Sequence, residues 1–340
     1  MLSVLIAIII IALFFEFTNG FHDAANVVAT PIATKSLTPN QAIILAAFFN
    51  FFGAFFGTAV ASTISKGLVD AQAVTNIVLV SALLGAIGWN FFTWGFGVPS
   101  SSSHALIGSL VGAVIISSSY KNVNLVTLLD KVIYPMIASP LIAFFLALAI
   151  CIFLLNIFIR IKNIRTTNKY IRETQIVSMS LLSFSHGSND AQKTMSIITL
   201  ALLSAQASGH IHFPDWVISD THVPSWVVII CASAMAIGTL SGGKKIIKTL
   251  STKLAALQPV NAVSAELSSG LLVLAASHIG LPVSTTQVVS GSIMGAGYTD
   301  NGVNGKVVRK MVTAWVLTIP ACIFVTSVIY MSLYYTVGSF

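Results

Sequence analysis

Two aspartate motifs place ionisable side chains within otherwise apolar sequence. The first reads NGFHDAAN at residues 19–26, and the second reads SHGSNDAQK at residues 185–193. Asp190 lies 190 − 23 = 167 residues after Asp23, and Lys193 keeps the same offset from Asn26. Ionisable groups within a bilayer are costly, so they usually face a polar cavity and serve function. The matched motifs therefore predict one site built from two related halves of a duplicated chain.

Each aspartate has a polar partner one helical turn later. Asp23 and Asn26 are three residues apart, as are Asp190 and Lys193, so each pair lies on one helix face. Carboxylate and carboxamide oxygens suit hard cations, which predicts a site for a proton or for Na⁺ at Asp23, Asn26 and Asp190. Lys193 can take the place of a bound cation, or it can form only a structural ion pair with Asp190.

Further polar residues beside the motifs are candidates for proton or ion handling. Glu16 lies two helical turns before Asp23, and Glu266 has no acidic counterpart in the first half. Both belong with Asn189 to the coupling-ion candidates, because buried carboxylates in a membrane usually face the protein interior. Histidine can relay protons near neutral pH, although a lone buried histidine is more often a simple hydrogen bonder. The supporting candidates are His22, His104, His186 and Gln287.

A second repeated motif combines proline with a run of hydroxyls. It reads GVPSSSSH at residues 97–104 and GLPVSTTQ at residues 280–287, an offset of 282 − 99 = 183 residues. Proline followed by Ser or Thr is typical of a helix start, where free N–H groups favour an anion. Alternatively, the hydroxyls only support helix packing or a kink. The predicted oxyanion ligands are Ser100, Ser101, Ser102, Ser103, Ser284, Thr285 and Thr286.

The composition indicates which elements position these motifs. Charged residues make up 8% of the chain and hydrophobic residues 56%, whereas soluble proteins are roughly a quarter charged. Runs long enough to cross a bilayer, about 20 residues, occupy much of the sequence. They lie at residues 1–15, 42–64, 74–98, 132–159, 225–240 and 311–337. We expect an all-α polytopic membrane protein with about 10–12 helical segments, some broken or re-entrant, in which residues 1–15 begin a retained helix.

The basic residues predict the orientation. They cluster at residues 160–172, 244–253 and 306–310, and short basic loops stay cytoplasmic. The net charge of +7 is thus a topology signal, and no nucleic acid partner is expected. With five segments per half, the second half is inverted relative to the first and both termini are extracytoplasmic. The predicted units are a first repeat at 1–160, a basic cytoplasmic linker at 161–175 and a second repeat at 176–340.

The four motifs together resemble the PiT family of inorganic phosphate transporters over essentially the whole chain. The resemblance implies a secondary symporter of the plasma (inner) membrane that carries phosphate with H⁺ or Na⁺. In some bacterial members the phosphate travels as a complex with a divalent metal. By position, Asp23, Asn26 and Asp190 would form the ion and substrate centre. The phosphate ligands would be Ser101, Ser102, Ser103, Ser284, Thr285 and Thr286.

Two departures from the family pattern bear on the coupling ion. Sodium-coupled members typically carry Gly-x-Asn-Asp-x-Ala-Asn in both copies, whereas here His22 and Lys193 replace an asparagine. A lysine would repel a second Na⁺, so H⁺ is the preferred coupling ion. Sulfate or another oxyanion is an alternative substrate, an ion channel is a weaker alternative, and a homodimer is a further option. No bound cofactor is expected, and the chain lacks His-Glu-x-x-His and Gly-x-Ser-x-Gly, which argues against an enzyme.

Overall fold

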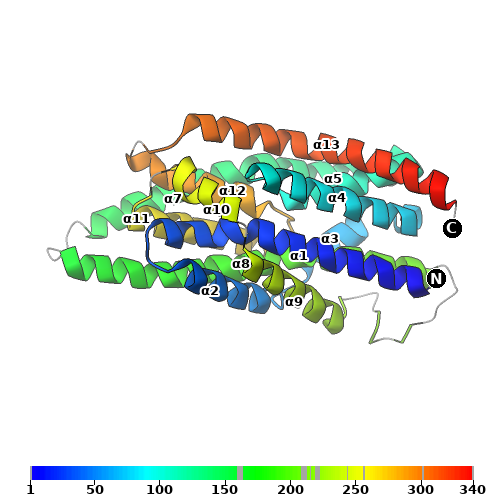
Figure 1. Ribbon diagram of the computed structural model, residues 1–340, viewed down its shortest axis with the longest axis horizontal. Coiled ribbons are helices and arrows are strands. Elements are labelled where there is room, and N and C mark those ends of the chain that lie inside the picture. Colours follow the sequence, from blue (N-terminus) through cyan, green and yellow to red (C-terminus); the bar gives the residue numbers. More distant parts are fainter. Residues whose placement is uncertain are drawn as a thin grey trace.

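The computed structural model describes residues 2–158, 164–207, 213–214, 216–218, 223–242, 244–255, 257–300 and 302–338. Long helices lie roughly parallel to the long axis of the molecule, with α1 and α8 crossing its centre and α13 along one edge (Figure 1). The start of α1 and the end of α13 lie at the same end of the molecule (Figure 1). This agrees with the expectation that both termini share one side of the membrane.

The described elements are helices and short helical turns in both halves of the chain. The first half contains α1 (Leu2–Ala33), α2 (Pro39–Gly53), α3 (Ala59–Gly67), the 3-10 turn η1 (Ala71–Ala73), α4 (Asn76–Phe96), α5 (Ser102–Ser117), η2 (Tyr120–Asn122), α6 (Leu125–Thr127), the π-helical η3 (Leu128–Ile133) and α7 (Tyr134–Phe158). The second half contains α8 (Ile164–Ala207), α9 (Ser225–Ser241), α10 (Lys244–Lys248), the π-helical η4 (Thr249–Leu254), α11 (Pro259–His278), α12 (Thr285–Gly297), η5 (Tyr298–Asp300) and α13 (Gly305–Val337).

Several helices are long and apolar enough to cross a bilayer. Among the described residues there are five, or six if the bent pair Ser225–Ser241 and Lys245–Leu254 forms one span. The five are Leu2–Ala33, Asn76–Phe96, Leu125–Phe158, Pro259–His278 and Gly305–Thr336. The all-helical, multi-span class predicted from composition is therefore confirmed. Residues 1–15 were expected to begin a membrane helix, and α1 continues through residues 2–33 without a break.

Two expectations about individual segments were wrong. The apolar run 42–64 is not one helix, because α2 ends at Gly53 and α3 begins at Ala59. The break is stabilised by Gln192 of α8, whose Oε1 accepts hydrogen bonds from the N–H groups of Val60 (2.8 Å) and Ala61 (3.2 Å). Residues 164–175 were expected in a loop, but they form the first turns of α8. The sequence between α8 and α9, residues 208–224, contains three histidines. Most of these residues, the histidines included, lie outside the part of the chain that the structure describes.

The two halves exchange packing partners. α1 packs on α9 and α8 packs on α2, while α5 packs on α13 and α12 packs on α7. Equivalent glycines permit the first pair of contacts, because a Cβ on Gly20 would lie 2.5 Å from the Met235 carbonyl oxygen of α9. A Cβ on Gly187 would likewise lie 2.1 Å from the Asn50 carbonyl oxygen of α2. These close crossings fix α1 and α8 at the centre of the protein.

Candidate functional site

Asp23 lies in the middle of α1 and is 2% exposed. Its carboxylate accepts a hydrogen bond from the Ser102 hydroxyl of α5 (2.9 Å) and a longer one from the Thr286 hydroxyl of α12 (3.3 Å). The neighbouring His22 Nδ1 lies 2.8 Å from the same carboxylate, and His22 Nε2 lies 3.2 Å from the Thr93 hydroxyl of α4. Four helices therefore converge on this aspartate.

Asp190 occupies the equivalent position in α8 and is completely buried. Its carboxylate pairs with the Lys193 ammonium one turn later and accepts a hydrogen bond from the Thr285 hydroxyl of α12 (3.0 Å). His186 Nε2 lies 3.2 Å from Asp190 Oδ2. A buried ammonium next to a buried carboxylate lowers the cost of holding either charge away from water.

Two contacts that cross between the halves join these clusters. The Asn26 amide donates a hydrogen bond to the Thr286 hydroxyl at 2.9 Å. At the equivalent positions, the Lys193 ammonium donates to the Ser103 hydroxyl. Lys193 also donates to the Val283 carbonyl oxygen at 3.1 Å. Each half thus contributes a residue from its aspartate motif to the hydroxyl motif of the other half, so the structure brings the two pairs of motifs together.

The predicted hydroxyl ligands have three different kinds of partner. Ser101 and Ser284 are the N-caps of α5 and α12, and each accepts a hydrogen bond from a backbone N–H three residues later. Ser100 bonds to Trp89 and Thr318 instead of the aspartates. The hydroxyls that reach the centre belong to the first helical residues, namely Ser102, Ser103, Thr285 and Thr286. Three of these hydroxyls donate to the aspartates, so the starts of α5 and α12 both face the two carboxylates.

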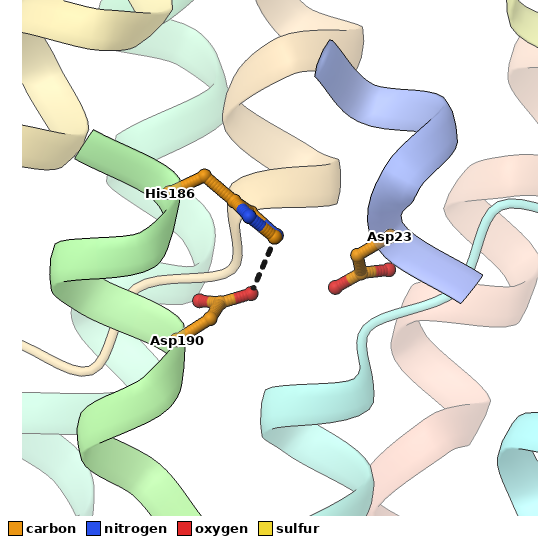
Figure 2. Close-up of side chains that lie close together, drawn as sticks. All are labelled: Asp23, His186 and Asp190. Atoms are coloured by element: carbon orange, nitrogen blue, oxygen red, sulfur yellow. Dashed lines mark ion pairs between the residues drawn. The ribbon is translucent and has the colours of Figure 1, made fainter. Parts of the chain in front are cut away.

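Three buried side chains come close enough to share one cation. One ligand atom each from Asp23, His186 and Asp190 lies within 4.8 Å of the others. Figure 2 shows His186 and Asp190 on α8 and the Asp23 carboxylate opposite them on α1. Two carboxylates and one imidazole are a donor set suited to first-row divalent metals. His186 was predicted only as a supporting residue, and the structure places it beside both aspartates.

The other candidates lie in or near the same buried region, but not all touch the aspartates. Glu16 accepts a hydrogen bond from Thr194, and Glu266 accepts hydrogen bonds from Ser178 and Gln175. Glu266 belongs to α11, and its partner Ser178 lies on α8 twelve residues before Asp190. Twelve residues correspond to about 18 Å along a helix, so Glu266 lies well away from Asp190. Asn189 donates to the Leu281 carbonyl oxygen at 3.2 Å. His104 and Gln287 are buried in α5 and α12.

Some residues that support the site were not singled out from the sequence. Asn19 accepts a hydrogen bond from Ser102 at 2.6 Å, so it shares this hydroxyl with Asp23. Asn50 of α2 contacts His186, and Thr93 of α4 contacts His22. Asn19 and His186 are related by the offset of 167 that relates the aspartates, so the repeat itself could have identified Asn19. Asn50 and Thr93 carry no such signal.

These features define a multi-pass membrane protein in which buried carboxylates, hydroxyls and a lysine from both halves lie together. The chain matches the model of the phosphate transporter family over residues 19–326. It therefore belongs to that family, which is a family of transporters and not of enzymes.

Relatives and one solved structure agree with this assignment. The chain is 45% identical over 324 residues to the "Probable low-affinity inorganic phosphate transporter" of Bacillus subtilis (strain 168), covering 94% of each protein. It is 42% identical to the protein of the same name from Rhizobium meliloti (strain 1021), covering 96% of this chain and 95% of the relative. A structure titled "The sodium-dependent phosphate transporter" superposes with a TM-score of 0.82 at 24% identity, covering 98% of this chain and 100% of that one. That likeness shows a shared fold.

Proposed function

We propose that the chain is a symporter of the plasma membrane that imports inorganic phosphate, with H⁺ as the preferred coupling ion. The observation that carries the proposal is the position of Lys193, whose ammonium joins Asp190 of its own half to Ser103 of the other half. The phosphate assignment is supported by the 45% identical Bacillus subtilis relative, whose name gives inorganic phosphate as its substrate. Sulfate is the alternative oxyanion.

The anion would bind between the starts of α5 and α12. Ser102, Ser103, Thr285 and Thr286 supply four hydroxyls, and each helix start adds free N–H groups and a partial positive charge. In the structure these hydroxyls contact the aspartates, Asn26 and Lys193 directly. Phosphate would therefore replace these contacts, and the two helix starts would separate to admit it.

Charge balance explains why a cation must accompany the anion. With all three groups ionised, Asp23, Asp190 and Lys193 leave one net negative charge in the buried centre. An anion is unfavourable there until a further positive charge arrives. With asparagine at position 193 the centre would carry two negative charges and would need two cations. Lys193 thus takes the role of one coupling ion as a fixed part of the protein.

The Lys193 ammonium stands in for one cation, and the hydrogen bonds around His186 indicate where the transported coupling ion would bind. Thr239 donates its hydroxyl proton to the Met235 carbonyl oxygen, so Thr239 accepts from the Asn50 amide nitrogen (2.9 Å). The Asn50 amide oxygen then faces His186 Nδ1 at 3.1 Å, which must carry a hydrogen. In the neutral imidazole, Nε2 is then an acceptor.

This acceptor lies 3.2 Å from Asp190 Oδ2, which is also an acceptor when ionised. Two acceptors at this distance repel each other unless a proton or a metal ion lies between them. Na⁺ prefers oxygen ligands, so an imidazole nitrogen favours a proton over Na⁺ as the ion bound here.

A second candidate function follows from the same group of residues. Asp23, His186 and Asp190 could receive a divalent metal that travels with phosphate as cargo. This alternative keeps the same anion site, but the metal ion would bring two positive charges into the centre where a proton brings one. It differs in what enters with the phosphate, so the metal dependence of uptake separates it from proton coupling.

The transport cycle would use the duplication of the chain. We take residues 1–160 and 176–340 as inverted repeats joined by a cytoplasmic segment, with both termini extracytoplasmic. In such transporters one repeat or bundle moves against the other around a central site. The contacts Asn26–Thr286 and Lys193–Ser103 lie between the halves, where such a movement would open the site.

Uptake of labelled phosphate into proteoliposomes, with Na⁺, pH and divalent metal varied independently, tests the proposal. We expect uptake without Na⁺, loss of uptake with a protonophore, and no competition by sulfate. Strict Na⁺ dependence would contradict proton coupling, and uptake that requires a divalent metal would favour the second candidate. Saturable uptake with counterflow separates a symporter from a channel.

Substitution of Lys193 tests the role of the fixed charge. Lys193→Asn should make phosphate uptake dependent on Na⁺, whereas Lys193→Arg, which keeps the charge, should not. Lys248→Asn is the matched control, because Lys248 is an exposed lysine of α10. If Lys193→Asn transports with the same ion dependence as the unmodified protein, Lys193 does not replace a cation.

A further inference from the structure

A groove of about 750 Å³ lies between α4 and α13, away from the central site. Its walls are mostly aromatic and aliphatic side chains, and three basic side chains line it as well. The apolar group is Trp89, Phe92, Phe96, Val98, Ala314 and Leu317, and the basic group is Lys306, Arg309 and Lys310. Its volume is that of a typical small-ligand site. Figure 1 shows α4 running alongside α13, on which it packs.

The groove opens toward the surrounding lipid. Phe92 is 58% exposed, Phe96 72% and Leu317 51%. These side chains lie on α4 and α13, both of which are long and apolar enough to span a bilayer. Exposed aromatic and aliphatic residues at this depth contact acyl chains. Two threonines, Thr93 and Thr313, also line the groove, but their hydroxyls donate to the backbone carbonyl oxygens of Trp89 and Arg309 in their own helices. The walls therefore do not form a polar path for free phosphate.

The three basic residues give the groove one polar end. Lys306, Arg309 and Lys310 are exposed and occupy the first two turns of α13. Within the described part of the chain, none of them forms an ion pair, and no carboxylate lines the groove. A basic cluster beside an apolar cleft between membrane helices has the chemistry that binds anionic phospholipid headgroups.

We infer that this groove binds an anionic phospholipid, with its phosphate on Lys306, Arg309 and Lys310 and an acyl chain between α4 and α13. The wall of the groove is connected to the central site. Thr93 lines the groove and contacts His22, which contacts Asp23. Trp89 also lines it and donates to Ser100 in the first hydroxyl motif at 2.9 Å. The bound lipid would therefore pack directly behind the start of α5.

Native mass spectrometry of the purified full chain tests the inference. The probes are phosphatidylglycerol and phosphatidylcholine with identical acyl chains. We expect phosphatidylglycerol to be retained preferentially. Each basic residue near an anionic lipid contributes about a fivefold gain in affinity, so Lys306→Gln, Arg309→Gln and Lys310→Gln together should weaken phosphatidylglycerol binding about 100-fold.

Two further variants separate a groove from general surface attraction. The control combines Arg172→Gln, Lys248→Gln and Lys253→Gln, which removes the same charges from other exposed positions and should change binding less than threefold. Ala314→Phe fills the groove while it keeps the three cations, and should also abolish retention. Equal losses in the two charge variants, or full retention in Ala314→Phe, would overturn the inference. Displacement of the lipid by millimolar inorganic phosphate would also overturn it, because the groove would then be a path for phosphate.

Discussion

The close crossing of α2 and α8 makes a specific prediction for Gly187→Ala. A Cβ at this position would lie 2.1 Å from the Asn50 carbonyl oxygen and 2.8 Å from its Cα, whereas ordinary contact begins near 3.4 Å. The obstacle is backbone, so α2 as a whole must move by roughly 3.4 − 2.1 = 1.3 Å to relieve the overlap. Such overpacking costs about 1–3 kcal/mol.

A second loss follows from the same movement. The Asn50 Oδ1 atom lies 3.1 Å from His186 Nδ1. A movement of α2 by roughly 1.3 Å would break this hydrogen bond, at a cost of about 1 kcal/mol. Alanine regains about 1 kcal/mol through its higher helix propensity. The net expectation is a destabilisation of about 1–3 kcal/mol and a His186 that no longer holds its orientation beside Asp190.

Thermal unfolding in detergent and phosphate uptake measure the two effects. The matched control is Gly88→Ala in α4, where an added Cβ would have no atom of the described residues within 4 Å beyond its chain neighbours and the nearby backbone of its own helix. The control should be as stable as the unmodified protein or slightly more stable, with unchanged uptake. Gly187→Ala should unfold at a lower temperature and transport phosphate more slowly. Equal melting temperatures for the two variants would refute the argument that the crossing has no room for a methyl group.

Three further substitutions test other contacts. Thr285→Val removes the hydroxyl that donates to Asp190 at 3.0 Å in the structure. A hydrogen bond to a charged group contributes about 1.5–3 kcal/mol, so the variant should unfold at a lower temperature in the absence of phosphate, and an unchanged melting temperature would show that this bond contributes little. Glu266→Gln replaces a carboxylate oxygen that accepts a hydrogen bond from Gln175 or Ser178 with an amide NH₂ group, which cannot accept. The variant should therefore unfold at a lower temperature, while its KM for phosphate changes less than twofold. A large change in KM would place Glu266 in the transport site. Gln192→Leu removes the acceptor for the N–H groups of Val60 and Ala61. The loss of about 1–2 kcal/mol should speed labelling of a cysteine placed at Thr58, which lies in the same break, and unaltered labelling would show that the break does not depend on the Gln192 side chain.

The repeated offsets made the central site predictable. Asp23 and Asp190 share the offset of 167 with Asn26 and Lys193, and the structure brings all four residues together with the hydroxyl motifs. Composition likewise predicted the helical membrane class. The membrane class depends on local hydrophobicity, which short stretches of chain determine, whereas the site was recognised by comparing short motifs between the two halves.

The contacts between helices could not be read from the same sequence. Spacing along α8 does not determine which hydroxyl Lys193 will meet on α5, and it does not show that Ser100 bonds to Trp89 and Thr318 instead of the aspartates. The break between α2 and α3 depends on Gln192, a residue more than 130 positions later. Such features arise from the packing of distant segments, so a single sequence carries little information about them.

The exchange of partners between the halves has a consequence for how the protein is made. When α7 leaves the ribosome, α1, α2 and α5 have been synthesised, but α8, α9 and α13, on which they pack, have not. The polar faces of α1 that carry Glu16 and Asp23 then lack the Thr194 and Thr286 hydroxyls that later bond to them. The amino-terminal half must therefore wait in the membrane with its polar residues incompletely covered. A membrane chaperone, or slow release from the insertion machinery, would be of most use to the newly made chain during this interval.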